Sequence, residues 1–321
     1  MGVRPRLELT VLTGFLGSGK TTLLRRVLDT SGGKGVAVVV NEFADIGLDQ
    51  LLANGPCEAC LLVSGGCGCC DRREELLAAL RRLLDDHERG ALRGLRRVVI
   101  ETSGLADPAP IAIAVAADPV LCHHFEPATI VAVVDGVAGA EQLERHVEVK
   151  RQIHVTDRVV ISKTDLAQAA DIAELERVLS ELNPTATIDS AQGAMGSLFG
   201  PSNRLPPSPV GANITSAVGH QHTQAVAGLS LTFDEPLDWV AFGVWLSMLL
   251  HAHGQELLRV KGVIEASGLG AVAINAVQHL MYPPEHLGSR QDAHLARLVF
   301  IMRDLEPQSI ARSLWAFQQV A

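Results

Sequence analysis

Residues 14–21 read GFLGSGKT, which fits the pattern G-x-x-x-x-G-K-[ST] of a phosphate-binding loop. The apolar stretch 7–12 before it predicts a strand, and residues 20–29 after it have the apolar spacing of a helix. In such an arrangement the backbone N–H groups of the loop surround phosphate oxygens, and the helix N-terminus adds a partial positive charge. The stretch therefore predicts a nucleotide-binding fold built on a P-loop.

The loop supplies the first group of predicted site residues. We expect the Lys20 ammonium to reach the β- and γ-phosphates and the Thr21 hydroxyl to ligate Mg²⁺, so both are assigned to catalysis. The residues expected to contact the nucleotide phosphates are Gly14, Gly17, Ser18, Gly19, Lys20, Thr21 and Thr22.

A second motif, ETSG at 101–104, follows an apolar strand at 97–100. Ligands bind at the carboxyl ends of the strands in open α/β sheets, and Glu101 falls at such an end. We expect Glu101 to hold the Mg²⁺ shell or to orient the attacking water. The N–H of Gly104 is expected to respond to the γ-phosphate, as switch segments do.

A third motif, SKTD at 162–165, ends the apolar strand 158–162 and resembles the base-recognition motif [N/T]KxD of GTPases. The Asp165 carboxylate can accept hydrogen bonds from the imino and amino groups of guanine, a pair of donors that adenine lacks. The Lys163 stem can lie over the base, and Ser162 stands where Asn is usual, with a shorter reach. These three residues are therefore the expected base contacts, and GTP is the expected nucleotide.

Strands and helices alternate along the first 190 residues. The strands are expected at 7–12, 35–40, 97–100, 129–134, 158–162 and 187–189, and the helices at 20–29, 72–88, 109–117, 141–151 and 169–182. This alternation predicts an α/β fold, with residues 1–190 forming a P-loop domain on a doubly wound, mostly parallel sheet. Residues 191–216 are rich in Gly, Pro and Ser and predict a linker, and residues 217–321 predict a smaller C-terminal α+β domain.

Five of the six cysteines fall within PCEAC and GGCGCC. Three interpretations are open: a redox pair or disulfide, a structural Zn²⁺ site that includes Cys57 and Cys60, and an open site of three thiolates. Cys67 and Cys69 can converge across a glycine, and Cys70 opens a helix, whose N-terminus stabilises a thiolate. We favour three thiolates holding Zn²⁺, Co²⁺ or Cu⁺, because an open fourth position suits a metal that must be delivered.

The composition limits the class of protein. The 321 residues carry a formal net charge of −9, and no basic run offsets it, which argues against nucleic acid as the main partner. No apolar run reaches the ~18 residues that a membrane span needs, and the N-terminus leads directly into a strand. We therefore expect a cytoplasmic protein without a membrane partner, whose thiols stay reduced.

Seven stretches of the sequence together form a recognisable set of motifs: GFLGSGKTTLL, NEFADIGLD, GGCGCC, IETSGLADPAPI, VVDG, SKTDL and LLRVKGVI. Through them the chain resembles the CobW-type P-loop GTPases over nearly its whole length, and the C-x-C-C motif is the most specific mark. The resemblance implies a GTP-hydrolysing metallochaperone in which Cys67, Cys69 and Cys70 bind the metal, with Glu42 beside it. It implies zinc first, with cobalt or iron next, and a client metalloprotein as the recipient.

A second function class is a regulatory switch that responds to metal and nucleotide, with incidental GTP turnover. Four features depart from the family pattern: Ser162 replaces Asn, Ala44 replaces the usual Gly, Cys57 and Cys60 form an additional pair, and the His-rich tract of some members is missing. Six histidines are candidate accessory ligands that we expect to be ordinary surface residues: His123, His124, His220, His222, His251 and His253.

Overall fold

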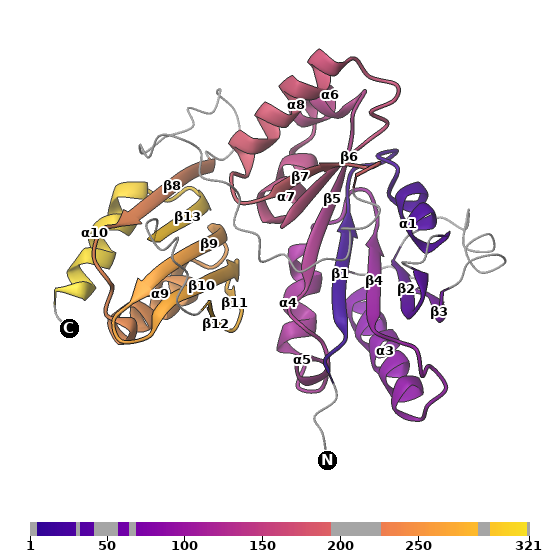
Figure 1. Cartoon of the computed structure of the whole chain (residues 1–321), viewed down its shortest axis with the longest axis horizontal. Coiled ribbons are helices and arrows are strands. Elements are labelled where there is room, and N and C mark those ends of the chain that lie inside the picture. The colour runs from indigo at the N-terminus through magenta and orange to yellow at the C-terminus, as the bar shows by residue number, and fades with distance from the viewer. Residues whose placement is uncertain are drawn as a thin grey trace. The chain divides into compact units, whose positions relative to one another are not determined.

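The computed structural model describes residues 5–29, 33–41, 57–63, 69–193, 226–287 and 296–319, with the backbone alone for residues 41 and 69–72. The chain divides into two compact units. The first contains strands β1 to β7 and the second contains strands β8 to β13, each with its own helices (Figure 1). Each unit also has its own hydrophobic core.

The first unit is built on a seven-stranded sheet in the order β3-β2-β4-β1-β5-β6-β7, and every neighbouring pair is parallel. Parallel neighbours require crossover connections, and their strands are apolar because helices cover both faces. The predicted doubly wound parallel sheet is therefore confirmed. Its strands are β1 (Glu8–Thr13), β2 (Val36–Asn41), β3 (Ala59–Leu62), β4 (Arg97–Thr102), β5 (Thr129–Asp135), β6 (Arg158–Ser162) and β7 (Thr187–Ser190).

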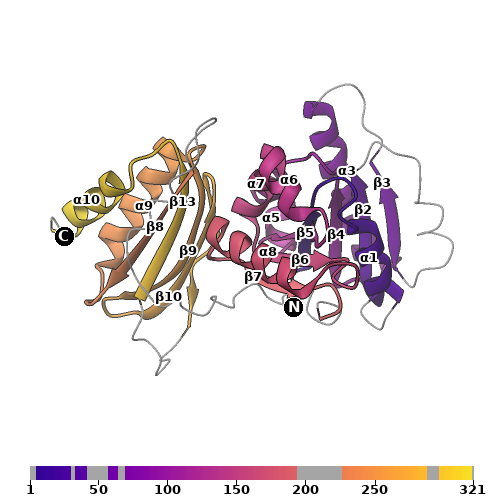
Figure 2. The ribbon, with the colours of Figure 1, turned by 90° about the horizontal axis from the view of Figure 1, so that it is seen from above.

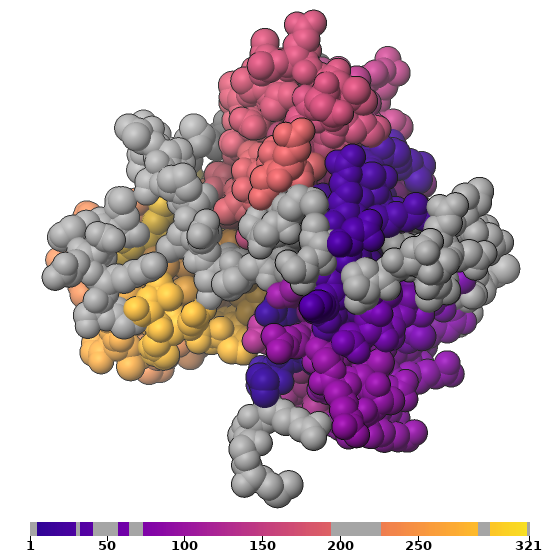
Figure 3. Space-filling view, turned by 45° about the vertical axis from the view of Figure 1, so that its right-hand side comes forward, coloured from indigo at the N-terminus to yellow at the C-terminus, as the bar shows by residue number. Residues whose placement is uncertain are grey.

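The helices of the first unit bury apolar side chains against both faces of this sheet. Leu23, Leu24 and Val27 of α1 pack with alternate residues of the central strands, and α6, α7 and α8 pack with the intervening residues of β5 and β6. Segments from the start of the chain, indigo, and from α3 onward, purple, lie against each other in the space-filling view (Figure 3). The helices are α1 (Lys20–Asp29), α3 (Cys69–Glu88), α4 (Ala109–Ala117), α5 (Leu121–His124), α6 (Gly139–Arg145), α7 (Val147–Val155) and α8 (Ala169–Leu182).

One predicted helix is two helices in the structure. The sequence predicts a continuous helix over 141–151, but α6 ends and α7 begins at His146, whose backbone is extended (φ −122°, ψ 115°). Leu143 of α6 and Val149 and Ile153 of α7 all join the same core. A continuous helix would turn Leu143 away from Val149, because residues six apart point about 120° from each other around the helix axis. The break at His146 allows both segments to face the sheet.

Strand β3 is absent from the sequence prediction, which read these residues only as a cysteine pair. In the structure β3 is parallel to β2, with Cys60 beside Val38, and Cys57 and Cys60 pack against the core beneath α1. The strand is four residues long and lies at the sheet edge. So short a stretch carries too little apolar periodicity to be distinguished from a loop.

The second unit is a six-stranded antiparallel sheet, in the order β11-β10-β9-β13-β8 with β12 beside β10. Helices α9 and α10 lie on the same side of this sheet (Figure 2), and the core fills the space between them. The predicted α+β fold of this part is confirmed. Its elements are β8 (Val226–Phe233), α9 (Trp239–His253), β9 (Leu257–Ala266), β10 (Gly270–Val277), β11 (Leu280–Met281), β12 (Glu285–His286), β13 (Ala296–Arg303) and α10 (Pro307–Gln318).

The sequence PLDW favours a helix with Pro236 in its first turn, because proline suits that position, but α9 starts later. The helix begins at Trp239, and the carboxylate of Asp238 accepts a hydrogen bond of 2.8 Å from the N–H of Ala241. An acidic N-cap satisfies one of the donors that the first turn leaves free. The Trp and Phe residues at helical spacing in this segment favour an apolar core, and Phe242 and Trp245 are buried in the structure.

The predicted linker lies largely outside the described residues. Its first residue, Ala191, is still part of the first unit, because its side chain is buried in that core and its N–H donates to the Ile161 carbonyl at 2.8 Å. The domain limits at 190 and 217 stay predictions. Among the helices that the structure describes, none has the length and apolar character needed to cross a membrane.

Candidate functional site

The P-loop joins β1 to α1 at the carboxyl edge of the parallel sheet. Gly14 has φ +142°, and a Cβ there would collide with the carbonyl oxygen of Val133 on β5, so the position requires glycine. Gly17 and Gly19 also have positive φ values, of 75° and 90°. The loop therefore curls tightly over the sheet edge, as expected of a phosphate-binding loop.

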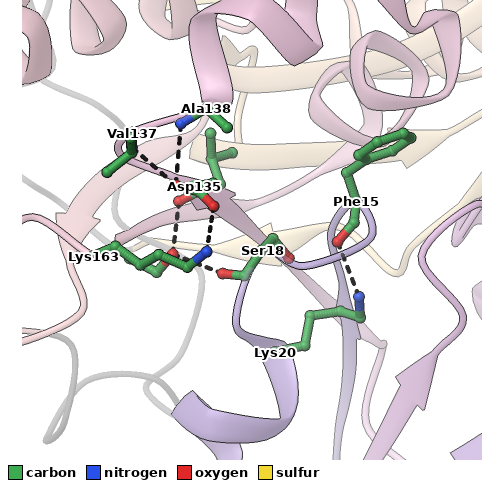
Figure 4. Close-up of polar contacts among 9 residues, drawn as sticks. Phe15, Ser18, Lys20, Asp135, Val137, Ala138 and Lys163 are labelled. Carbon is green, nitrogen blue, oxygen red and sulfur yellow. Dashed lines mark hydrogen bonds and ion pairs between the residues drawn. The ribbon is translucent and has the colours of Figure 1, made fainter. Parts of the chain in front are cut away.

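Lys20 begins α1 and is folded back over the loop. Its side chain is buried, and its Nζ donates to the carbonyls of Gly14 at 2.8 Å and Phe15 at 3.2 Å (Figure 4). The ammonium is thus held beside the backbone groups that surround the phosphate position. This placement agrees with the predicted role of Lys20, which stays a prediction.

Ser18 carries a polar atom suited to a phosphate. Its side chain is 1% exposed, and within the described residues its Oγ makes no hydrogen bond. Leaving a buried hydroxyl unsatisfied costs about 1–3 kcal/mol. A phosphate oxygen bound in the loop would supply the missing partner, so the loop fits a nucleotide phosphate.

Thr21 and Glu101 meet at the edge of the sheet. The Thr21 hydroxyl donates to Glu101 Oε1 at 2.5 Å, and Glu101, the penultimate residue of β4, is 1% exposed. Hydroxyl and carboxylate oxygens are the ligands that Mg²⁺ prefers, and the ion keeps several waters when only a few side chains bind it. The pair therefore fits the predicted Mg²⁺ site.

The segment after β4 lies directly against the P-loop. A Cβ on Gly104 would lie 2.7 Å from the backbone nitrogen of Leu16, so the two segments are in backbone contact. The carbonyls of Gly104 and Ala106 accept hydrogen bonds of 3.2 and 3.0 Å from the side-chain amide of Gln152 on α7. The structure thus brings Gly104 next to the loop that it is predicted to monitor.

The residues predicted to bind guanine lie at and just after the end of β6. Two of them, Ser162 and Lys163, also make contacts within the protein. The Ser162 hydroxyl lies 2.6 Å from the Ser18 carbonyl and 3.2 Å from the Val134 carbonyl, and so links β6 to the P-loop. Lys163 has a left-handed backbone (φ 53°), and its Nζ forms an ion pair of 2.5 Å with Asp135 (Figure 4). Asp165 is exposed at the following turn, where a base can reach its carboxylate.

Asp135 ends β5 and organises the turn that follows. Its Oδ1 accepts hydrogen bonds from the N–H groups of Val137 at 2.9 Å and Ala138 at 3.1 Å, and its Oδ2 binds Lys163. Burial acts to raise the pKa of Asp135, but the Lys163 hydrogen bond and the two N–H groups outweigh it, so the pKa lies below its usual range. The carboxylate is therefore ionised at neutral pH.

The predicted metal ligands lie mostly outside what the structure describes. Glu42 and Cys67 fall outside the described residues, and Cys69 and Cys70 are described only by their backbone, which begins α3. The other pair is better defined: burial, helped by Cys57 and Glu101, raises the pKa of the Cys60 thiol to about 11. A protonated thiol is a poor nucleophile, which disfavours Cys60 as the attacking member of a redox pair.

The histidines form no metal centre in the described part of the chain, where no group of three His, Cys, Asp or Glu side chains is arranged to hold an ion. His123 and His124 end α5, and His251 and His253 fall in the last turn of α9. His220 and His222 lie outside the described residues.

Two site residues escaped the sequence analysis. Asp135 could have been predicted from the sequence, because it ends an apolar strand and so falls at the same sheet edge as Glu101. Gln152 could not have been predicted, because a single glutamine within a helix usually has a solvated side chain.

Comparison with protein families gives two matches along the chain. Residues 8–189 match the family described as CobW/HypB/UreG, nucleotide-binding domain, and residues 226–318 match the Cobalamin synthesis protein cobW C-terminal domain. The two matched ranges correspond to the two units of the structure.

Individual relatives agree with these matches. The zinc chaperone YjiA of Escherichia coli (strain K12) is 32% identical over 270 residues, which cover 82% of this chain and 83% of the relative. The zinc-regulated GTPase metalloprotein activator 1 of Schizosaccharomyces pombe is 31% identical over 189 residues, which cover 57% of this chain and 45% of the relative. The crystal structure of Zn(II)-bound YjiA GTPase from E. coli aligns with a TM-score of 0.71 at 26% identity, over 98% of this chain and 99% of that chain.

Proposed function

The chain belongs to the CobW/HypB/UreG family and is a P-loop GTPase, and we propose that it is a metallochaperone that uses GTP hydrolysis to deliver a transition metal to a client protein. The observation that carries the proposal is the position of α3. In a parallel sheet each crossover helix begins at the carboxyl edge of the strands. Since α3 begins at Cys69, the last two cysteines of the C-x-C-C motif begin this helix at the edge that also carries the P-loop and Glu101.

In this proposal the nucleotide is held by residues already close together. The P-loop N–H groups, Lys20 and the Ser18 hydroxyl bind the phosphates, and Asp165 accepts from guanine. Thr21 and Glu101 would hold Mg²⁺, which would supply positive charge to offset the phosphates. Glu101 also orients the attacking water, and the N–H of Gly104 distinguishes GTP from GDP.

The cargo is held by the thiolates of Cys67, Cys69 and Cys70, with Glu42 nearby. Asn41, the residue before Glu42, pairs with Thr102, so the chain leaves β2 beside the predicted Mg²⁺ site. Three thiolates leave a fourth position on a tetrahedral metal open to an incoming ligand from the client. Zinc is the first choice because the relatives named above are zinc proteins, and cobalt and iron come next.

The test is a transfer assay with a chromophoric zinc chelator as a stand-in for the client. The protein is loaded with Zn²⁺ and GTP, hydrolysis is started with Mg²⁺, and the rate at which zinc reaches the chelator is followed. We expect transfer to keep pace with GTP turnover. The matched controls are Lys20→Ala, which should hold zinc without releasing it, and Cys57→Ser, which should transfer normally.

Two results would count against the proposal. Zinc transfer at the same rate with GTP, GDP and no nucleotide would mean that hydrolysis does not drive delivery. Stoichiometric zinc that persists in a variant with Ser at 67, 69 and 70 would place the metal elsewhere. Strong zinc control of GTP turnover without transfer would favour the regulatory switch.

A further inference from the structure

Gln152 is a buried polar side chain that the nucleotide motifs do not include. It lies on α7 and is 1% exposed, and its amide nitrogen donates to the carbonyls of Gly104 and Ala106. Because both partners are carbonyl oxygens, the NH₂ group must face them, so the chemistry fixes the orientation of the amide. One side chain thus supplies two hydrogen bonds to the segment that follows Glu101.

The same pair of helices also touches the P-loop. At the break between α6 and α7, the His146 ring lies against Phe15 of the loop, with ring centroids 4.4 Å apart and an interplanar angle of 31°. The next loop residue, Leu16, is in backbone contact with Gly104. The start of α7 is therefore fixed relative to the P-loop, and Gln152, farther along the helix, fixes the Gly104 segment relative to both.

We propose that Gln152 is a positioning residue for GTP hydrolysis, which holds the Gly104–Ala106 segment at the distance from the P-loop where it distinguishes GTP from GDP. The inference rests on the proposed role of Gly104. GDP lacks the phosphate that this segment would meet, so Gln152 acts on GTP affinity and turnover and leaves GDP affinity unchanged. A side chain that only fills space in the fold would affect stability and both nucleotides alike.

The first test compares Gln152→Met, which keeps the size of the side chain and removes both donors, with the wild-type protein. We expect kcat for GTP to fall by roughly tenfold, because losing one or two uncharged hydrogen bonds would let the Gly104–Ala106 segment leave the position that hydrolysis needs. Affinity for a non-hydrolysable GTP analogue should fall relative to GDP, whose Kd should stay within about twofold. The matched control is Gln142→Met on α6, whose side chain makes no hydrogen bond within the described residues.

A second variant keeps the proposal testable if Gln152→Met folds poorly. Gln152→Glu has the same shape but cannot donate while ionised, and it regains one donor when protonated. Its kcat, divided by that of the wild type at each pH, should rise as the pH falls from about 8 to 5. Gln152→Met, having no group to titrate, should give a flat ratio.

The outcomes separate this inference from the proposed function. Normal kcat and normal GTP-to-GDP selectivity in a folded Gln152→Met or Gln152→Glu variant would overturn the positioning role, and so would an equal loss of GTP and GDP affinity. The proposed role of Gly104 is tested by Gly104→Ala, whose Cβ would push the segment away from Leu16. If Gly104→Ala hydrolyses GTP normally, that role is wrong; the Gln152 variants then report only on their own two hydrogen bonds.

Discussion

At the scale of single residues, the predicted recognition of guanine depends on Asp165. Ser162, which stands where Asn is usual in this motif, already directs its hydroxyl to the Ser18 carbonyl. The Lys163 ammonium is paired with Asp135. The aliphatic part of the Lys163 side chain can therefore contact the base, while its charge is already used by Asp135. The exposed Asp165 carboxylate is therefore the group left to read the edge of guanine.

Asp165→Ala should abolish the preference for GTP over ATP. The change leaves guanine donors without an acceptor, which costs about 1–3 kcal/mol, or roughly tenfold or more in Kd for GTP. Affinity for ATP should change little. The measurement is a titration with both nucleotides, with Asp171→Ala on the exposed start of α8 as the control. Equal affinity of the wild-type protein for GTP and ATP would contradict the guanine assignment.

Asp135 makes stability depend on pH in a direction that its contacts determine. Its pKa in the folded protein lies below the value in the unfolded chain, because Lys163 and two N–H groups favour the ionised form. Such a group stabilises the fold above its unfolded pKa of about 4, and this contribution is lost as the pH falls through the folded pKa.

Asp135→Asn should lower the free energy of unfolding at pH 7 by about 1–2 kcal/mol, a moderate figure because Lys163 is partly exposed to solvent. The difference from the wild type should begin to shrink as the pH falls below about 4, where the unfolded chain binds a proton at this residue, and should vanish once the pH has passed the lower pKa of the folded protein. Urea denaturation at a series of pH values measures it, and Asp171→Asn serves as the exposed control. A difference that stays constant down to the lowest pH would show that the charge of Asp135 contributes nothing.

At the scale of helices and strands, the sequence predicts best where one pattern continues long enough. The bounds of α1, α4 and α8 agree with the prediction. Helices α1 and α8 have a clear apolar pattern, whereas α4 is apolar almost throughout and is marked by Pro108 before it and Asp118 after it. The prediction of one continuous helix over 141–151 was wrong. The break at His146 depends on how Leu143 and Val149 pack on the sheet, and this tertiary packing is not visible in a local sequence pattern.

The residues of the candidate site also differ in how well the sequence predicts them. Lys20, Thr21 and Glu101 could be predicted because a local motif or a strand end marks them, and their roles stay predictions. Gln152 was not found, because its function depends on a segment some fifty residues earlier that only the fold brings near. The sequence therefore identifies groups that contact a ligand more readily than groups that position them.

Helix α9 offers a test of local structure away from the nucleotide. Asp238→Ala removes the side chain that accepts from the Ala241 N–H and should cost about 1 kcal/mol of stability. Thermal or urea unfolding measures the loss, and the control is Asp234→Ala, an exposed residue of the same connection. Asp238→Asn should keep most of the stability, since its amide oxygen can also accept. Equal stability of both Asp238 variants and the control would mean that the cap contributes nothing.

At the scale of the whole molecule, the predicted metal site and the predicted nucleotide site belong to one unit. The P-loop, Glu101 and the start of α3 all lie at the carboxyl edge of the first sheet, while the second unit has a separate core and sheet. Ion pairing joins α3 to the elements after Gly104, since Arg81 of α3 binds Asp118 at the end of α4. A change at either site thus has a physical connection to the other.

This arrangement predicts that metal and nucleotide bind with linked free energies. If GTP orders the segments around the edge, the three thiolates and Glu42 should come together around the metal, and hydrolysis should loosen them. A metal that binds one nucleotide state better must change the affinity for that nucleotide by the same factor, and such couplings are usually about 1–3 kcal/mol, or roughly 5- to 150-fold. We expect Zn²⁺ or Co²⁺ to bind more tightly to the Mg²⁺–GTP form than to the GDP form.

The measurement is a competition titration with a chromophoric chelator, using a non-hydrolysable GTP analogue and GDP. Replacing Cys67, Cys69 and Cys70 by Ser should remove the difference while nucleotide affinity without metal stays normal. Arg81→Met should reduce the difference if the link to Asp118 transmits it, and should leave each single-ligand affinity nearly unchanged. Because linkage is reciprocal, zinc must also favour GTP over GDP by the same factor. Equal zinc affinity in the two nucleotide states would make the cysteine motif a structural feature, and GTP hydrolysis would then have no means of releasing the metal.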